Sequence, residues 1–179
     1  MLAWAESRPH ESGSKARDTA GADKMKAIIE LCRNAGQGIA LTYMKFQLAE
    51  ELLELGQYPE ALEQLERGLQ HIEQFGELFL EPEYYRLRGL LCMAEFDSSK
   101  DQSDLEEGIE FLTDAVSRAK IKQTKALQLR AATDLAVALS YKGETETAAE
   151  MLEDVIDSFE EFDDSGDCIR AREVLNNMR

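Results

Sequence analysis

Apolar residues recur every three or four positions along residues 48–69, LAEELLELGQYPEALEQLERGL. This spacing is typical of amphipathic helices that carry one apolar stripe each. Gly56 can end the first helix because glycine readily adopts positive φ, and Pro59 fits the first turn of the second helix, where no amide donor is lost. Small residues in both helices would let the two backbones approach closely: Ala49, Ala61 and Gly68. The pattern therefore predicts a helical hairpin that cannot bury its apolar faces alone.

The hairpin pattern recurs along the chain. Around Gly143, the segment AATDLAVALSYKGETETAAEMLEDVI repeats it position by position. Another copy fits residues 88–112, where Gly89 and Gly108 are the small residues. Equivalent small residues in each second helix are separated by 40, 47 and 40 positions: Gly21, Ala61, Gly108 and Ala148. A period of this size predicts an open stack of hairpins rather than a closed globule.

These hairpins resemble the tetratricopeptide repeat (TPR), and the resemblance covers residues 18–179. The residues that carry it in two of the repeats are Ala49, Gly56, Tyr58, Ala61 and Leu65, and Ala136, Gly143, Ala148 and Leu152. The interval of 40 residues departs from the common repeat of about 34, which implies longer helices. The resemblance implies an all-α fold, a right-handed α–α superhelix of TPR-like helical hairpins with a period of about 40 residues.

Two runs carry a narrower resemblance. Residues 85–89, YRLRG, and residues 129–136, LRAATDLA, are similar to the C-terminal repeats of bacterial adenylate-cyclase-like and LuxR-type signal-transduction ATPase regulators. In those regulators the repeats follow a P-loop ATPase, whose G-x-x-x-x-G-K-[ST] motif this sequence lacks. The resemblance implies a role in bacterial signalling or transcription regulation, with the catalytic or DNA-binding parts supplied elsewhere.

The repeats suggest two regions in the chain. Residues 1–17 are either a disordered tail or the remnant of a first helix, and residues 18–179 are the TPR-like repeat domain. The domain divides into a half repeat, three hairpins and a capping helix: 18–34, 39–75, 82–120, 124–161 and 165–178. The polar segment 97–102 reads as an insertion between helices, and Ser103 and Glu106 as a capping box that opens the next helix.

Net charge and cysteine usage limit the partners and the cellular compartment that we expect for this chain. The net charge is −16, from 36 acidic and 20 basic side chains, which argues against nucleic acid and against an anionic membrane surface as partners. There is no apolar run of 18 or more residues that would cross a membrane. The three cysteines show no C-x-x-C spacing, which favours a reducing cytoplasm. Cys92 falls on an apolar stripe and is expected to be a small core residue.

Motifs for catalysis and metal binding do not occur. The two histidines, His10 and His71, are far apart, and we expect His71 on a helix surface. No H-E-x-x-H motif and no Ser-His-Asp or Cys-His pairing is suggested. The acidic loop 97–108 lacks the glycine and the glutamate of a calcium loop. We therefore predict a protein that is not an enzyme and needs no cofactor and no metal.

The TPR resemblance implies a concave face lined by the first helix of each hairpin. The candidate partner-binding residues on it are Tyr43, Phe46, Glu50, Arg86, Leu90, Met93, Arg130, Thr133 and Tyr141. Aromatic, methionine and arginine side chains suit an interface core. Arg86 and Arg130 could hold a partner carboxylate, but pairing with neighbouring glutamates such as Glu50 or Glu83 is the favoured alternative. Tyr43 and Phe46 could equally be buried between adjacent hairpins.

The predicted function is therefore a non-catalytic interaction or regulatory module that binds a protein or peptide in the concave groove. The alternative is a self-associating structural protein, a homodimer formed through the exposed end of the array or through the groove. A small-ligand sensor or an enzyme comes third, because it would need a convergent polar pocket that the sequence does not reveal.

Overall fold

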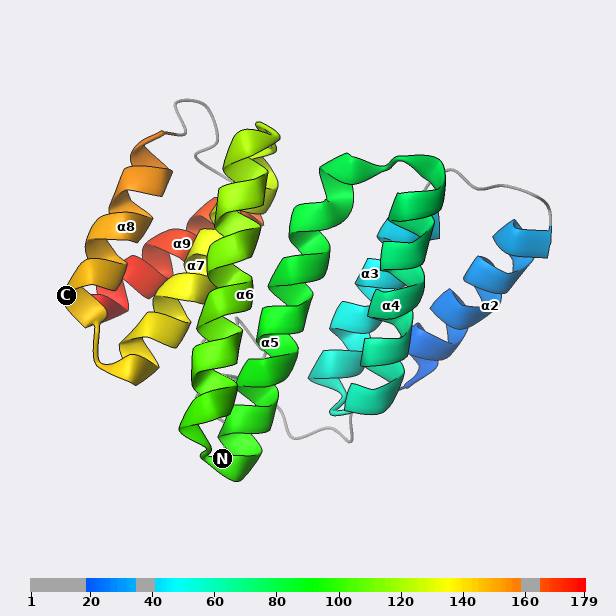
Figure 1. Ribbon diagram of the computed structural model, residues 1–179, viewed down its shortest axis with the longest axis horizontal. Helices are drawn as coiled ribbons and strands as arrows, with labels where there is room; N and C mark the ends of the chain where they lie inside the picture. The colour runs from blue at the N-terminus through cyan, green and yellow to red at the C-terminus, as the bar shows by residue number, and fades with distance from the viewer. Residues whose placement is uncertain (1–18, 35–40, 159–164) are drawn as a thin grey trace.

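The computed structural model describes residues 19–34, 41–158 and 165–179. Helix accounts for 89% of these residues and none is in a strand, so the expected all-α class is confirmed for the described part of the chain. Its elements (Figure 1) are α2 (Ala20–Asn34), α3 (Leu41–Glu54), α4 (Tyr58–Phe75), the 3-10 turn η1 (Leu78–Leu80), α5 (Glu81–Ser99), α6 (Gln102–Ile121), α7 (Lys125–Lys142), α8 (Thr145–Asp157) and α9 (Gly166–Met178).

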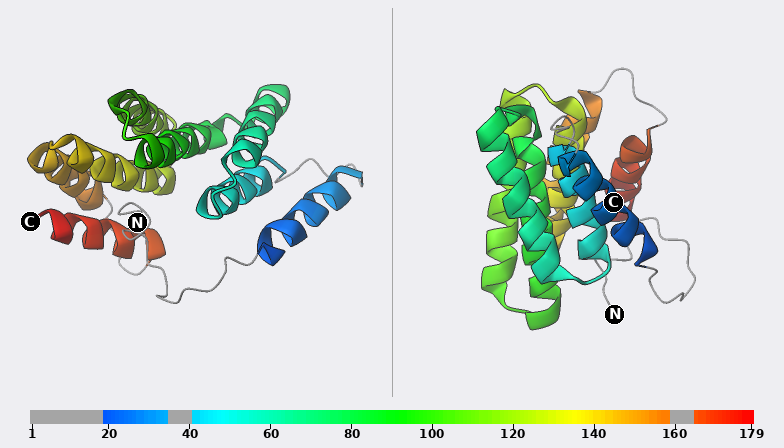
Figure 2. Two further views of the ribbon diagram at one scale, coloured as in Figure 1. Left: turned by 90° about the horizontal axis from the view of Figure 1, so that it is seen from below. Right: turned by 90° about the vertical axis from the view of Figure 1, so that its right-hand side faces the viewer.

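Neighbouring helices pair along the chain. Helix α3 packs on α4, α5 on α6, and α7 on α8, while α5 also touches α3 and α7. The first helices of the pairs therefore lie side by side, and α4 and α6 cover them on one side (Figure 2). Helix α2 packs on α3, and α9 packs on α7 and α8, so these two helices lie at opposite ends of the arrangement (Figure 2).

The glycines at two hairpin corners act as predicted. Gly56 has φ 75° and Gly143 has φ 89°, a left-handed conformation that costs other residues energy. At both corners the amide after the glycine donates to the carbonyl five residues earlier, at 2.8 and 2.9 Å. This is the hydrogen-bond pattern of a Schellman motif, which ends a helix cleanly. Pro59 lies in the first turn of α4, also as predicted.

The small residues of α5 and α6 mark a close crossing. A Cβ atom added to Gly89 would lie 2.6 Å from Leu112 Cγ and 3.0 Å from the carbonyl oxygen of Gly108. A Cβ atom added to Gly108 would lie 3.3 Å from the carbonyl oxygen of Gly89. The two backbones therefore lie so close together that a larger side chain at either glycine would force neighbouring atoms to shift. In the preceding hairpin, the ring of Phe46 lies over Gly68 in the same way.

The predicted core is confirmed at the repeat positions. Seven of the residues that defined the repeats have no exposed surface: Ala49, Leu52, Ala61, Leu65, Ala136, Ala148 and Leu152. Cys92, expected in the core, is also buried. The division at residues 1–17 and the ends of the hairpins at 39–40 and 159–161 lie outside the described residues.

The polar segment 97–102 differs from its prediction. Its first three residues are the last three of α5, and Lys100 caps that helix with φ 58°. Helix α6 then begins two residues later, with Asp101 as its N-cap, and the Asp101 carboxylate accepts from the Ser103 amide at 3.0 Å. The predicted capping box at Ser103 was therefore wrong by two residues, because an aspartate was available to cap the helix earlier.

No helix in the described ranges has the length and apolar character needed to span a bilayer.

Candidate functional site

The expected groove residues are partly hidden. They come from α3, α5 and α7, but five of the nine are at most 2% exposed: Phe46, Arg86, Leu90, Met93 and Thr133. The expectation that these five face an open groove is corrected, since α5 is contacted by α3, α4, α6 and α7. Tyr43 is 48% exposed, while Glu50, Arg130 and Tyr141 are partly buried.

Arg86 lies at the centre of a buried charge network. Its guanidinium donates to Asp134 Oδ2 at 2.8 Å, to Glu50 Oε1 at 2.8 Å, and to both carboxylate oxygens of Glu83 at 2.7 and 2.9 Å. Burial by itself would lower the pKa of Arg86, but Glu83, Glu50 and Asp134 outweigh it and raise the pKa above its usual value. The side chain is a permanent cation, and each of its three nitrogens donates to a carboxylate of the chain.

The network continues to the last helix. Asp134 accepts a further bond from Arg170 of α9 at 2.6 Å. Arg130 lies 3.7 Å from Glu83 and donates to Asp167 at 2.8 Å. Burial by itself would lower the pKa of Arg130, but the bond to Asp167 and the charge of Glu83 raise it. The favoured alternative, that Arg86 and Arg130 pair with neighbouring acids, is therefore confirmed.

The network ties together helices that are distant in the sequence. We call its members the charge ladder: Glu50, Glu83, Arg86, Arg130, Asp134, Asp167 and Arg170. They alternate in sign across α3, α5, α7 and α9. Because buried charges are costly unless they are paired, a different register of these helices would leave some of the charges without a partner.

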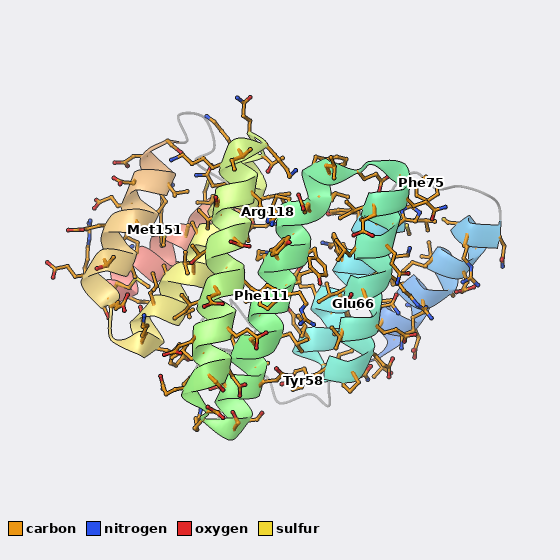
Figure 3. All side chains as sticks on the ribbon, viewed as in Figure 1. Tyr58, Glu66, Phe75, Phe111, Arg118 and Met151 are labelled. Carbon is orange, nitrogen blue, oxygen red and sulfur yellow. The ribbon has the colours of Figure 1, made fainter. Side chains whose placement is uncertain are left out.

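A cavity of about 590 Å³ lies among α2, α3 and α4, the first three helices of the described chain. Part of its wall is apolar: Ile29, Leu41 and Phe75. Three amides add polar groups: Gln64, Gln70 and Gln74. Figure 3 shows Phe75 at the C-terminal end of α4. A cavity of this size, with an apolar wall and a few polar groups, is typical of small-molecule sites.

Cations gather in this cavity. Arg33 of α2, Lys45 of α3 and Arg67 of α4 line it, against one carboxylate, Glu30. Arg33 pairs with Glu30, and Arg67 pairs with Glu63 at 2.7 Å. Lys45 has no carboxylate within salt-bridge distance in the described part of the chain, and its ammonium donates to the carbonyl of Arg67 at 3.4 Å. Burial lowers the pKa of Lys45, and the charges of Arg67 and Arg33 lower it further, whereas the charge of Glu77 opposes them.

His71 forms part of the wall and is mostly buried. Its expected place on a helix surface was wrong: Nδ1 lies 2.8 Å from Thr42 Oγ1, and the ring packs 4.3 Å from that of Phe75. Thr42 donates its only hydroxyl proton to Glu77, so His71 Nδ1 carries a proton and donates to Thr42. Burial and the charge of Lys45 lower the pKa of His71, and Glu77 opposes them. The imidazole is therefore neutral near pH 7.

Two arginines of α5 and α6 are engaged differently. Arg118 of α6, labelled in Figure 3, lies 4.0 Å above the ring of Tyr85 and donates to Glu81 at 2.8 Å. Arg88 lies 5.2 Å above the ring of Phe111. These arginines hold α5 and α6 together. Lys45 thus differs from them in facing a cavity without an aromatic or acidic partner at contact distance in the described residues.

Most of the large exposed apolar side chains come from the N-terminal part of the described chain. Of the eight in the described ranges, six belong to α2, α3, α4 and η1, and one of them, Phe75, lines the cavity: Ile28, Leu31, Tyr43, Phe75, Leu78 and Phe79. The other two are Ile121 and Ile169. The described residues contain no group of three or more histidine, cysteine or acidic side chains arranged to hold a metal ion.

Comparisons with known proteins give no match: no family model fits the chain, and no curated protein resembles it significantly. The TPR resemblance and the narrower one to the ATPase regulators therefore stay predictions.

Proposed function

We propose that this chain is a non-catalytic binding module, a TPR-like stack of hairpins that holds a protein or peptide partner. The observation that carries the proposal is that most large exposed apolar side chains of the described residues come from α2, α3, α4 and η1. Leu31, Phe75 and Phe79 are each more than half exposed, on α2, α4 and η1. We take these side chains to form one apolar patch, and such a patch usually marks a surface that a partner covers.

The proposed binding surface is therefore placed at α2, α4 and η1 rather than along the middle of the inner helices. The charge ladder supports this placement, because it uses the arginines that would otherwise attract a partner at the centre. It also supports a stiff scaffold, and a stiff scaffold loses little entropy on binding. By resemblance, the setting is bacterial signalling or transcription regulation, and the reduced cysteines favour the cytoplasm.

Self-association is the second candidate, because the same apolar end could be covered by another copy of the chain. A dimer formed there would bury Leu31 and Phe79 in an isologous interface. Sedimentation over a wide concentration range separates the two candidates. If the sedimentation mass of the wild type rises with concentration and that of Leu31→Ser/Phe79→Ser stays at the monomer value, self-association explains this surface better than partner binding does.

A displayed peptide library tests partner binding directly. The immobilised wild type, Leu31→Ser/Phe79→Ser, and the control Ile169→Ser would be panned in parallel. Ile169 is 48% exposed, but it lies on α9, which packs on α7 and α8 rather than on α2, α4 or η1. We expect peptides that bind the wild type and the control but are lost with the double variant. Peptides that bind all three equally would contradict this surface, and a failure to enrich any peptide would contradict the function.

A further inference from the structure

We propose that the cavity among α2, α3 and α4 binds a small organic anion, with a carboxylate or phosphate group on Lys45 and Arg67 and an apolar body against Phe75. This goes beyond the proposed function, because it adds a small-molecule ligand to a protein-binding module. The carboxylate and the phosphate share the chemistry that the cavity offers, which is positive charge next to an apolar wall.

The charge distribution is the first argument. The chain carries 36 acidic and 20 basic side chains, yet three cations and a single carboxylate line this cavity. They come from three different helices, so the local sequence pattern of one helix does not account for the cluster. Arg33 and Arg67 are paired with Glu30 and Glu63, whereas Lys45 has no carboxylate within salt-bridge distance in the described residues. A bound anion would give Lys45 the close negative partner that the two arginines already have.

Lys45 is the second argument. It is partly buried, and within the described residues its ammonium has one hydrogen bond, to the carbonyl of Arg67, which uses one of its three donors. The neighbouring cations and the burial already make its charge costly, as the lowered pKa indicates. An anion in contact with this ammonium would gain a charge-assisted hydrogen bond in a site partly shielded from water.

The remaining wall sets the shape of the ligand. Gln70 and Gln74 are exposed at the rim and can donate from their amides, whereas Ile29 and Leu41 are buried below them. The ring of Phe75 stands beside the neutral ring of His71. A volume of about 590 Å³ accommodates a ligand larger than a bare inorganic ion. An aromatic or aliphatic acid therefore fits the cavity better than free phosphate.

Titration calorimetry with three matched probes tests the proposal: phenylacetate, phenyl phosphate and the neutral benzyl alcohol. We expect saturable binding of at least one anion, one per chain, and much weaker binding of the alcohol. The two anions separate a carboxylate ligand from a phosphate ligand. Inorganic phosphate, as a fourth probe, shows whether the apolar body contributes. Equal binding of anion and alcohol, or no saturable binding of either anion, would overturn the proposal.

Matched variants locate the site. Lys45→Gln should weaken anion binding roughly ten- to a hundredfold, as expected for a lost charge-assisted hydrogen bond. Lys142→Gln removes an exposed lysine of α7 and should leave the affinity unchanged. If Lys45→Gln does not fold, as judged by circular dichroism, Arg67→Gln replaces it. Unchanged affinity in a folded cavity variant would refute this site. Peptide binding that persists in Lys45→Gln would keep the proposed function while the anion site is judged separately.

Discussion

Arg86 of α5 and Asp134 of α7 form an ion pair whose nearest atoms lie 2.8 Å apart, and both side chains are almost completely buried. The two residues are 48 positions apart, and each has further partners 36 positions away, Glu50 and Arg170. The pair is thus the middle of the charge ladder that links the inner helices. Because each charge is satisfied by several others, removing one leaves the rest unpaired.

Arg86→Met should therefore lower the free energy of unfolding by about 3–5 kcal/mol, the usual cost of leaving buried charges without a partner. Urea unfolding followed by circular dichroism measures the change. The control is Lys26→Met, which removes a partly exposed pair with Glu60 and should cost no more than about 1 kcal/mol. Equal losses in the two variants would show that the ladder contributes little to stability.

The crossing of α5 and α6 gives a second prediction. Gly89→Ala places a Cβ atom 2.6 Å from Leu112 Cγ, so the helices must move apart. We expect a loss of about 1–3 kcal/mol from overpacking, despite the better helix propensity of alanine. Gly166→Ala is the control, because a Cβ atom there meets nothing within 4 Å. Thermal unfolding compares the two variants, and a stabilised Gly89→Ala would contradict the close packing.

Local sequence patterns were sufficient for the helices and for their corners. The positions of Ala49, Leu52, Ala61 and Leu65 repeat at helical spacing, and a residue that recurs on one helical face is buried wherever that face meets a neighbour. Gly56 ends a helix because of its own backbone freedom, which does not depend on the rest of the fold. These features depend on short stretches of chain, so one sequence reveals them.

The charge ladder and the cavity could not be located in this way. Pairing of Arg86 with Glu50 or Glu83 was the favoured alternative, but its bond to Asp134 of α7 joins residues 48 positions apart, which the local pattern around Arg86 does not include. Likewise, Arg33, Lys45 and Arg67 meet only after three helices pack. One signal was present: His71 lies three positions after Gly68, next to the buried stripe of α4. That spacing would have favoured a partly buried ring.

Cysteine reactivity provides a third prediction. Burial raises the pKa of the Cys92 thiol to about 12, and nearby acids such as Glu107 act in the same direction. Because the thiolate is the reactive form, Cys92 should resist a thiol reagent in the native protein and react only on unfolding. Cys32, which is partly exposed, should react first. Mass spectrometry of peptides after brief labelling distinguishes them, and Cys32→Ser is the control. Rapid native labelling of Cys92 would contradict its burial.

The environment of His71 predicts how stability depends on pH. Its folded-state pKa is lowered by burial and by Lys45 of α3, while Glu77 opposes the shift. The unfolded chain therefore binds a proton more readily than the folded chain. The contribution of His71 to stability is complete above its unfolded pKa of about 6.5 and is lost as the pH falls through the folded value. The wild type should thus lose stability on acidification from about pH 7 to pH 5.5.

The variant His71→Gln isolates this effect, because its amide can still donate to Thr42 but does not titrate. Urea midpoints at the two pH values should fall less in this variant than in the wild type. Both proteins keep Glu77 and Lys45, so protonation of other groups affects them alike to first order. If the urea midpoints of the two proteins fell by the same amount, the His71 ring would bind a proton as easily in the folded as in the unfolded state. The wall of the cavity would then carry an additional positive charge in mild acid.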